Sequence, residues 1–161
     1  MLMEVLTNQN PVLRKTSKHV PKVTKEIKQL IDNMEETMRS APGIGLAAPQ
    51  VGQLLRVIVC DAGDGLHVLI NPKIVSKSGT QVFIEGCLSL PGIEAPVERA
   101  NKVKVSAMDR NGKRIEIEAS DLLATVFQHE IDHLDGKLFI DRVSDPNLIT
   151  YKPKTPKEEA I

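Results

Sequence analysis

The feature that most constrains this chain is a helix-like segment, residues 120–133, that is apolar over much of its surface yet ends in His129-Glu130-Ile131-Asp132-His133. Two histidines four residues apart lie on one face of a helix, one turn apart. An apolar helix is buried, and buried imidazole and carboxylate groups need partners because unpaired buried charge is unfavourable. We therefore expect a buried helix whose two histidines bind a metal ion. The alternative, a helix that carries two histidines by chance, fits a buried segment less well than an exposed one.

Residues 54–118 show the pattern of β-strands. Several segments alternate apolar and polar residues, and Asn111-Gly112 is a strong signal for a hairpin turn. Alternation indicates sheets with one wet face, and such sheets are antiparallel. We expect strands at Leu55–Cys60, His67–Ile70, Gln81–Glu85, Val103–Asp109 and Arg114–Glu118.

Residues 23–38 form a second helical segment, with apolar side chains at helical spacing and charged or polar residues between them. In the later helix, Ser120 or Asp121 can cap the N-terminus and Gly136 can end it. The expected fold class is α+β: antiparallel β-sheets packed around a buried central helix that carries the HExxH motif, plus an N-terminal amphipathic helix.

The 161 residues are enough for one domain, expected at residues 1–144. Residues 145–161 contain Pro146, Pro153 and Pro156 and are expected to form an extended or disordered tail. The formal net charge is zero and aromatic residues make up 2%, which argues against direct nucleic-acid binding. No apolar run approaches the length of a membrane span and no secretory signal is visible, so we expect a cytoplasmic enzyme without membrane contact.

A catalytic metal ion takes three protein ligands and keeps one position open, so the two histidines leave one ligand to find. The candidates are Cys60, Cys87, Glu85, His19, His67 and nearby carboxylates, and spacing does not choose among them. Cys87 is favoured because glycine and proline bracket it, which is typical of a strand end where a side chain has a defined direction.

Three separated segments resemble the signature motifs of bacterial peptide deformylases in content, order and approximate separation. They are Gly43-Ile44-Gly45-Leu46-Ala47-Ala48-Pro49-Gln50, Glu85-Gly86-Cys87-Leu88-Ser89 and Gln128-His129-Glu130-Ile131-Asp132-His133. The similarity runs from near residue 5 to about residue 143. It implies that Cys87, His129 and His133 bind the metal ion, and that the substrate is the N-formyl-methionine end of newly made polypeptides.

The resemblance also implies roles for further residues. Glu130 is the expected general base, and the Gln50 side chain and the Leu88 backbone N–H are the expected donors to the negative oxygen formed during attack. The backbone of Gly43, Ile44 and Gly45 is expected to hold the substrate in an extended form. We expect Ile44, Leu122 and Val126 to wall the methionine pocket, and Gln128 and Asp132 to orient the histidines.

One sulfur and two nitrogens suit several divalent ions. The resemblance implies Fe(II) in the cell, and Zn, Ni or Co is expected in purified protein because divalent affinity generally rises from iron towards copper. It also implies a transient association with the ribosome, although not through this proline-interrupted tail. One departure is Glu94, which stands where many relatives have an arginine, so any substrate contact made by that arginine is in doubt. Nearby, Arg99 can pair with Glu85.

Two other functions compete with this prediction. A metallopeptidase can use the same helix motif, but a thiolate ligand and Gln50 argue against it. A binding protein that keeps the fold without catalysis is the second, and the presence of all three ligands and Glu130 argues against it.

Overall fold

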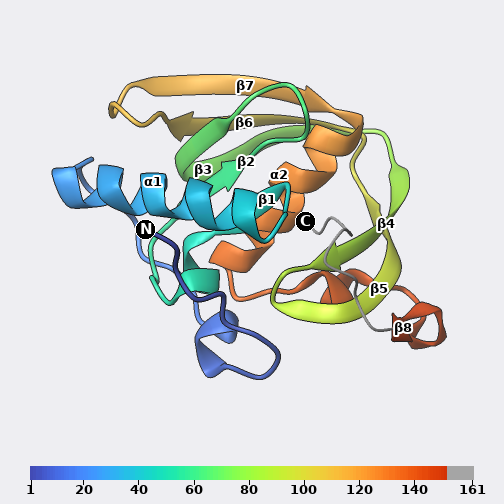
Figure 1. Ribbon diagram of the computed structural model, residues 1–161. Helices are drawn as coiled ribbons and strands as arrows, with labels where there is room; N and C mark the ends of the chain where they lie inside the picture. Colours follow the sequence, from blue (N-terminus) through green and yellow to red (C-terminus); the bar gives the residue numbers. More distant parts are fainter. Residues whose placement is uncertain (152–161) are drawn as a thin grey trace.

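The computed structural model describes residues 1–151, and within them the chain forms two antiparallel sheets and two α-helices (Figure 1). The five-stranded sheet has the order β1-β2-β3-β6-β7, and the three-stranded sheet has the order β4-β5-β8. The strands are β1 Gly45–Ala47, β2 Val57–Cys60, β3 His67–Ser78, β4 Gln81–Cys87, β5 Leu90–Arg99, β6 Lys102–Met108, β7 Arg114–Ser120 and β8 Thr150–Tyr151. The helices are α1 Lys25–Ser40 and α2 Asp121–Leu134, with 3-10 turns η1 Pro11–Arg14, η2 Ala48–Val51, η3 Phe139–Arg142 and η4 Pro146–Leu148. The expectation of an α+β fold with antiparallel sheets is confirmed.

Helix α1 begins at Lys25, two residues later than the apolar pattern suggests, because the Thr24 side chain accepts a hydrogen bond from the Ile27 amide and caps it. Its buried residues recur every three or four positions and face β1 and β2. They are Leu30, Ile31, Met34, Thr37 and Met38.

Helix α2 is buried along residues 124–134 and contacts strands of both sheets (Figure 1). The predicted Ser120 cap is wrong: Ser120 stands at the N-cap position, but its side chain makes no capping hydrogen bond. The start is instead held through Asp121, which has a φ of +58°. The Asp121 carbonyl accepts a hydrogen bond from Gln81 Nε2, and its carboxylate accepts one from Asn101 Nδ2. Gly136, with a φ of +73°, follows the helix as predicted.

Besides shifts of a few residues at strand ends, three strands differ from the sequence-based expectation: β5, β1 and β3. Strand β5 was not predicted, because Pro91, Gly92 and Pro96 interrupt its pattern. Strand β1 lies in a glycine-rich segment and has only three residues. Strand β3 continues eight residues past Ile70 to Ser78, through irregular register against β6. The hairpin at Asn111-Gly112 is confirmed, since β6 and β7 pair antiparallel on either side of it.

Strand β2 is buried on both faces, which the alternation rule did not anticipate. Ile58 and Cys60 face the cluster under α2, while Val57 and Val59 face the cluster under α1. A third cluster joins the three-stranded sheet to η3 and contains Cys87, Leu90, Val97 and Phe139. The five-stranded sheet is therefore covered on both faces near β2, and the end of β4 is packed against the segment that follows α2.

The first part of the expected tail is attached to the three-stranded sheet. Thr150 and Tyr151 form β8 and pair with Glu94 and Ile93 of β5. The rest of the tail prediction falls on residues 152–161, which lie outside the described residues. Within residues 1–151, neither helix is long and apolar enough to cross a lipid bilayer.

Candidate metal centre

Cys87, His129 and His133 come together where the end of β4 meets the last two turns of α2. Their ligand atoms lie within 4.8 Å of one another, and all three residues are buried. Cys87 is the last residue of β4, and a two-residue turn, Leu88-Ser89, leads from it into β5. The bracketing of Cys87 by Gly86 and Pro91 thus marks a strand end, and the strand end directs the thiol towards the helix.

The spacing of these atoms fits one divalent ion. Cys87 Sγ is 3.4 Å from His133 Nε2. On a tetrahedral ion with sulfur at about 2.3 Å and nitrogen at about 2.0 Å, these two ligands stand about 3.5 Å apart. His129 Nε2 and both carboxylate oxygens of Glu130 have no hydrogen-bond partner within residues 1–151. Buried polar atoms without partners are rare, so their concentration here supports a metal site.

The Glu130 side chain extends from α2 towards β1. An ideal Cβ on Gly45 would clash with the Glu130 carboxylate, and it would stand 2.9 Å from Glu130 Cδ. Gly45 is therefore the residue that leaves space for this carboxylate. Burial raises the pKa of Glu130 to about 7, against the lowering effect of His129.

The other ring nitrogen of His129 is held by Glu85. His129 Nδ1 is 2.8 Å from Glu85 Oε1, so Nε2 is left for a metal ion. Arg99 donates from Nε and Nη2 to the two oxygens of Glu85, at 2.6 and 3.0 Å. Burial acts to raise the pKa of Glu85, but the hydrogen bonds from His129 and Arg99 lower it below its ordinary value. The expected Arg99–Glu85 ion pair is therefore present. It is buried, and it holds Glu85 in place against the candidate ligand His129.

The site favours a positive charge near His129. Burial acts to lower the pKa of His129, yet Glu130, Cys87 and Glu85 raise it to about 10. The pKa of His133 lies well below its ordinary value because of burial and the charge of His129. A divalent cation bound to the same atoms would supply the charge that the surrounding anionic groups favour.

Gln50 reaches the same centre from η2. Its Oε1 accepts a hydrogen bond from the Ala47 amide at 2.9 Å, which fixes the side chain. Its Nε2 donates to Ser89 Oγ at 3.1 Å and lies 3.5 Å from Cys87 Sγ. Leu88 lies between Cys87 and Ser89, so the backbone expected to act with Gln50 is adjacent in space. Ser89 was not singled out from the sequence, where only its place beside Cys87-Leu88 could have drawn attention to it.

The expected substrate-binding residues surround β1 and α2. Gly43 donates its amide to the Met38 carbonyl at the end of α1, and the Ile44 carbonyl accepts from Asp61. Val126 is fully buried in the cluster under α2, and Ile44 and Leu122 pack against that cluster. The three predicted pocket walls therefore share one apolar cluster.

Cys60, His67 and His19 are not members of the group of possible metal ligands that the described residues form. Cys60 is opposite Gly45 in the β1–β2 register, and burial raises the pKa of its thiol well above the ordinary value. His67 pairs with Asp64 and packs edge-on against Phe127. His19 is 3.5 Å from Asn71.

Among the described residues, neither Gln128 nor Asp132 forms a hydrogen bond with a histidine side chain, but Asp132 is linked to His129 through Arg99 and Glu85. Gln128 instead binds the backbone of Ala100 and Ala124. Asp132 accepts hydrogen bonds from Arg99 and Arg142.

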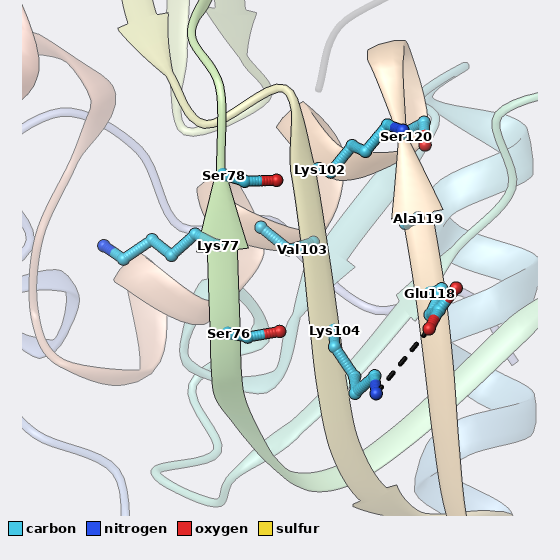
Figure 2. Close-up of a pocket in the computed structure, with 9 residues that line it drawn as sticks. All are labelled: Ser76, Lys77, Ser78, Lys102, Val103, Lys104, Glu118, Ala119 and Ser120. Atoms are coloured by element: carbon cyan, nitrogen blue, oxygen red, sulfur yellow. Dashed lines mark ion pairs between the residues drawn. The ribbon is translucent and has the colours of Figure 1, made fainter.

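A groove of about 320 Å³ on the five-stranded sheet is separate from this centre (Figure 2). It crosses the ends of β3, β6 and β7, and none of its lining residues is a candidate ligand. Lys104 in this groove is 3.6 Å from Glu118, which neutralises part of its charge. The groove offers no constellation for hydrolysis.

Comparisons with known proteins agree on one family. A family model described as polypeptide deformylase matches residues 2–148. The peptide deformylase of Acetivibrio thermocellus is 55% identical over 132 residues, covering 82% of this chain and 78% of the relative. That of Alkaliphilus metalliredigens is 52% identical over 139 residues, covering 86% and 95%. The crystal structure of the Thermotoga maritima peptide deformylase superposes with a TM-score of 0.88 at 43% identity, covering 90% of this chain and 99% of that one.

Proposed function

The chain belongs to the polypeptide deformylase family, a family of metal-dependent enzymes that remove the N-terminal formyl group from newly made polypeptides, and we propose that Cys87, His129 and His133 hold its metal ion. The observation that carries the proposal is the buried group of one thiol and two imidazoles with ligand atoms within 4.8 Å. The unpartnered Glu130 carboxylate beside it supports the same assignment.

The protein groups around the metal ion divide the work of hydrolysis. When bound, the divalent ion supplies Lewis-acid chemistry, which makes water more acidic and polarises a carbonyl. Glu130 takes a proton from the attacking water onto its carboxylate and returns it to the departing amine nitrogen. Its carboxylate packs against Gly45 of β1, which fixes its place in the centre. The products are formate and a free N-terminal amine.

Attack on the formyl carbon places negative charge on the carbonyl oxygen. Gln50 Nε2 and the Leu88 backbone N–H are the proposed donors to that oxygen. The hydrogen bonds of Gln50 to the Ala47 amide and to Ser89 fix its amide before the substrate binds. Donors held in place beforehand stabilise developing charge without reorganisation during the reaction.

The peptide is proposed to lie along β1, with the backbone of Gly43, Ile44 and Gly45 as its partner. Val126, Ile44 and Leu122 would wall the pocket for the methionine side chain. Their shared apolar cluster supports this placement, because an unbranched thioether side chain is bound mainly by apolar contact. We also propose α2 as the centre around which the two sheets assemble, since it contacts strands of both.

The metal in the cell is proposed to be Fe(II), with Zn, Ni or Co entering during purification, as the mixed sulfur and nitrogen ligands allow. We propose a cytoplasmic enzyme that acts on N-formyl-methionyl nascent chains and associates transiently with the ribosome. Direct nucleic-acid binding is not part of the proposal, because the formal net charge is zero.

The test compares three peptides on one anaerobically prepared, Co(II)-loaded sample: formyl-Met-Ala-Ser, the same peptide without the formyl group, and a longer formylated peptide. We expect formate from both formylated peptides and no change in the unformylated one. Cleavage of internal peptide bonds without formate release would contradict the proposal and support a metallopeptidase.

A further inference from the structure

We propose that Arg142 is a positioning residue for the metal centre, acting on His129 through a chain of three buried or nearly buried charged side chains. The chain runs from Arg142 to Asp132, then to Arg99 and Glu85, and ends at His129 Nδ1. The inference rests on the proposed metal site and adds a residue that no local sequence pattern indicates.

Each link of this chain is a direct hydrogen bond. Arg142 donates from Nε to Asp132 Oδ2 at 3.1 Å and from Nη2 to Asp132 Oδ1 at 2.9 Å. Arg99 donates from Nη1 to Asp132 Oδ2 at 3.0 Å. Arg99 also holds both oxygens of Glu85, and Glu85 Oε1 is 2.8 Å from His129 Nδ1. A change at Arg142 can therefore reach the ligand through three intervening residues.

The burial of the chain increases towards the metal centre. The exposed fraction of the side chain falls from 43% at Arg142 to 12% at Asp132, 5% at Arg99 and 0% at Glu85. Charges interact more strongly as water is excluded, so the inner pairs are sensitive to an imbalance at the outer end. Two cations and two anions are balanced along the chain while Arg142 is present.

Arg142 determines how Arg99 is shared. Glu85 and Asp132 are both carboxylates, and both accept hydrogen bonds from Arg99. Because Arg142 supplies Asp132 with two further donors, Arg99 keeps its Nε and Nη2 donors on Glu85. Without Arg142, Asp132 keeps one partner and draws Arg99 away from Glu85. The hydrogen bond between Glu85 and His129 Nδ1 then weakens.

The segment that carries Arg142 contacts His129 by a second route. Phe139 opens the same 3-10 turn, η3, and its ring stacks on the His129 ring with centroids 6.0 Å apart and an interplanar angle of 21°. Phe139 also belongs to the apolar cluster that contains Cys87. The 3-10 turn η3, which follows α2, thus contacts His129 through the Phe139 ring. It is also linked to His129 through the series of charged side chains that begins at Arg142.

The outer end of the chain is open to solvent. A groove of about 300 Å³ is lined by Arg99, Asp132 and Arg142 together with residues of β3 and β5. Substitution of Arg142 therefore admits water beside Asp132 and leaves the apolar core unchanged, so the variant should fold.

The test compares Arg142→Ala with Arg110→Ala in Co(II)-loaded protein. Arg110 is a matched control: its side chain is also 43% exposed, and it donates from Nε and Nη2 to one aspartate, Asp32, which lies outside the chain described above. Direct partners of metal ligands change metal affinity about 10- to 100-fold, so we expect a smaller effect at this distance. Arg142→Ala should release Co(II) to a chelator about three- to tenfold faster than wild type and should shift the visible Co(II) absorption bands. Arg110→Ala should change neither.

A second variant separates charge from hydrogen-bond geometry. Arg142→Lys keeps the cation but provides one donor group, so its release rate should fall between those of wild type and Arg142→Ala. Equal release rates and equal Co(II) spectra in Arg142→Ala and Arg110→Ala would overturn the inference, even if both variants lost the same thermal stability. Failure of wild-type protein to bind Co(II) would instead overturn the proposed metal site.

Discussion

At the metal centre, the Glu130 carboxylate and Gly45 constrain each other sterically. The carboxylate occupies the space that a side chain on Gly45 would need, so the glycine in β1 and the glutamate in α2 are required together. This explains why a glycine stands at a strand position, where it is otherwise unfavourable. The space taken by the Glu130 carboxylate, more than backbone conformation, accounts for Gly45, since its φ is not positive.

Replacement of Glu130 by Gln should leave the metal ion bound and remove most turnover. The amide keeps the size of the side chain but accepts no proton, so kcat should fall roughly 10²- to 10⁴-fold. The measurement is formate release together with metal content on the same sample. Glu118→Gln, an exposed carboxylate on β7, is the control and should keep full activity. Joint loss of metal and activity would show that Glu130 is a ligand and not a base.

The same substitution should change how the free energy of unfolding of metal-free protein depends on pH. The pKa of Glu130 rises from 4.5 to about 7 on folding, so ionisation of this carboxyl opposes folding. The penalty is absent below pH 4.5, grows as pH rises, and is complete above about pH 7, at roughly 3 kcal/mol. Glu130→Gln should therefore exceed wild type in free energy of unfolding at pH 8 and equal it at pH 4. Urea denaturation at both pH values measures this, and a gain of the same size at both would contradict it.

The sequence carried clear signals for some of these residues and none for others. The HExxH spacing and the position of Cys87 between glycine and proline are local sequence patterns. They predicted His129, His133 and Cys87, which the fold brings together. The links from Arg99 to Asp132 and from Asp132 to Arg142 join side chains that are 33 and 10 residues apart, and no local pattern encodes them. Gln128 was expected to orient the histidines, but its side chain hydrogen-bonds to the backbone of Ala100.

At the scale of elements, the centre depends on where β4 ends and on where α2 ends. The helix was predictable because its apolar surface and its HExxH motif agree. Strand β5 was not, since two prolines and a glycine disturb the alternation in a strand that pairs with β4 along most of its length. Pairing with β4 stabilises this strand despite its composition. Such tertiary effects are the usual reason that strands are not predicted from sequence propensity.

The exit from α2 depends on Gly136. Its φ is +73°, and a Cβ there would clash with the Arg14 backbone carbonyl. Gly136→Ala should lower the free energy of unfolding by more than the roughly 1–3 kcal/mol of a left-handed non-glycine residue. Gly63→Ala is the control, with a φ of +110° and open space around the added Cβ. Urea denaturation of both variants measures the difference, and equal losses would show that the Arg14 contact does not matter.

In the whole molecule, the proposed metal ion joins the two sheets. Cys87 comes from the three-stranded sheet, whereas both histidines come from α2, which packs against the five-stranded sheet. A bound ion therefore links the two sheets in addition to the apolar contacts at η3.

Chelation should accordingly lower the melting temperature. A ligand present at 100 times its Kd stabilises the folded state by about 2.7 kcal/mol, which corresponds to roughly 5–10 °C for a chain of this size. Calorimetry with and without EDTA measures the shift. In His133→Ala the same addition of EDTA should change the melting temperature little, and an equal shift in that variant would contradict the assignment of His133.

The most direct test of the account is a titration of metal-free protein with Fe(II) under anaerobic conditions, with formate release from a formyl-methionyl peptide as the readout. Activity should rise linearly and stop rising at one metal ion per chain, and the Cys87→Ser variant should show neither the tight binding nor the break. Formate release from metal-free protein, or a titration of Cys87→Ser that coincides with wild type, would contradict a centre built on Cys87, His129 and His133.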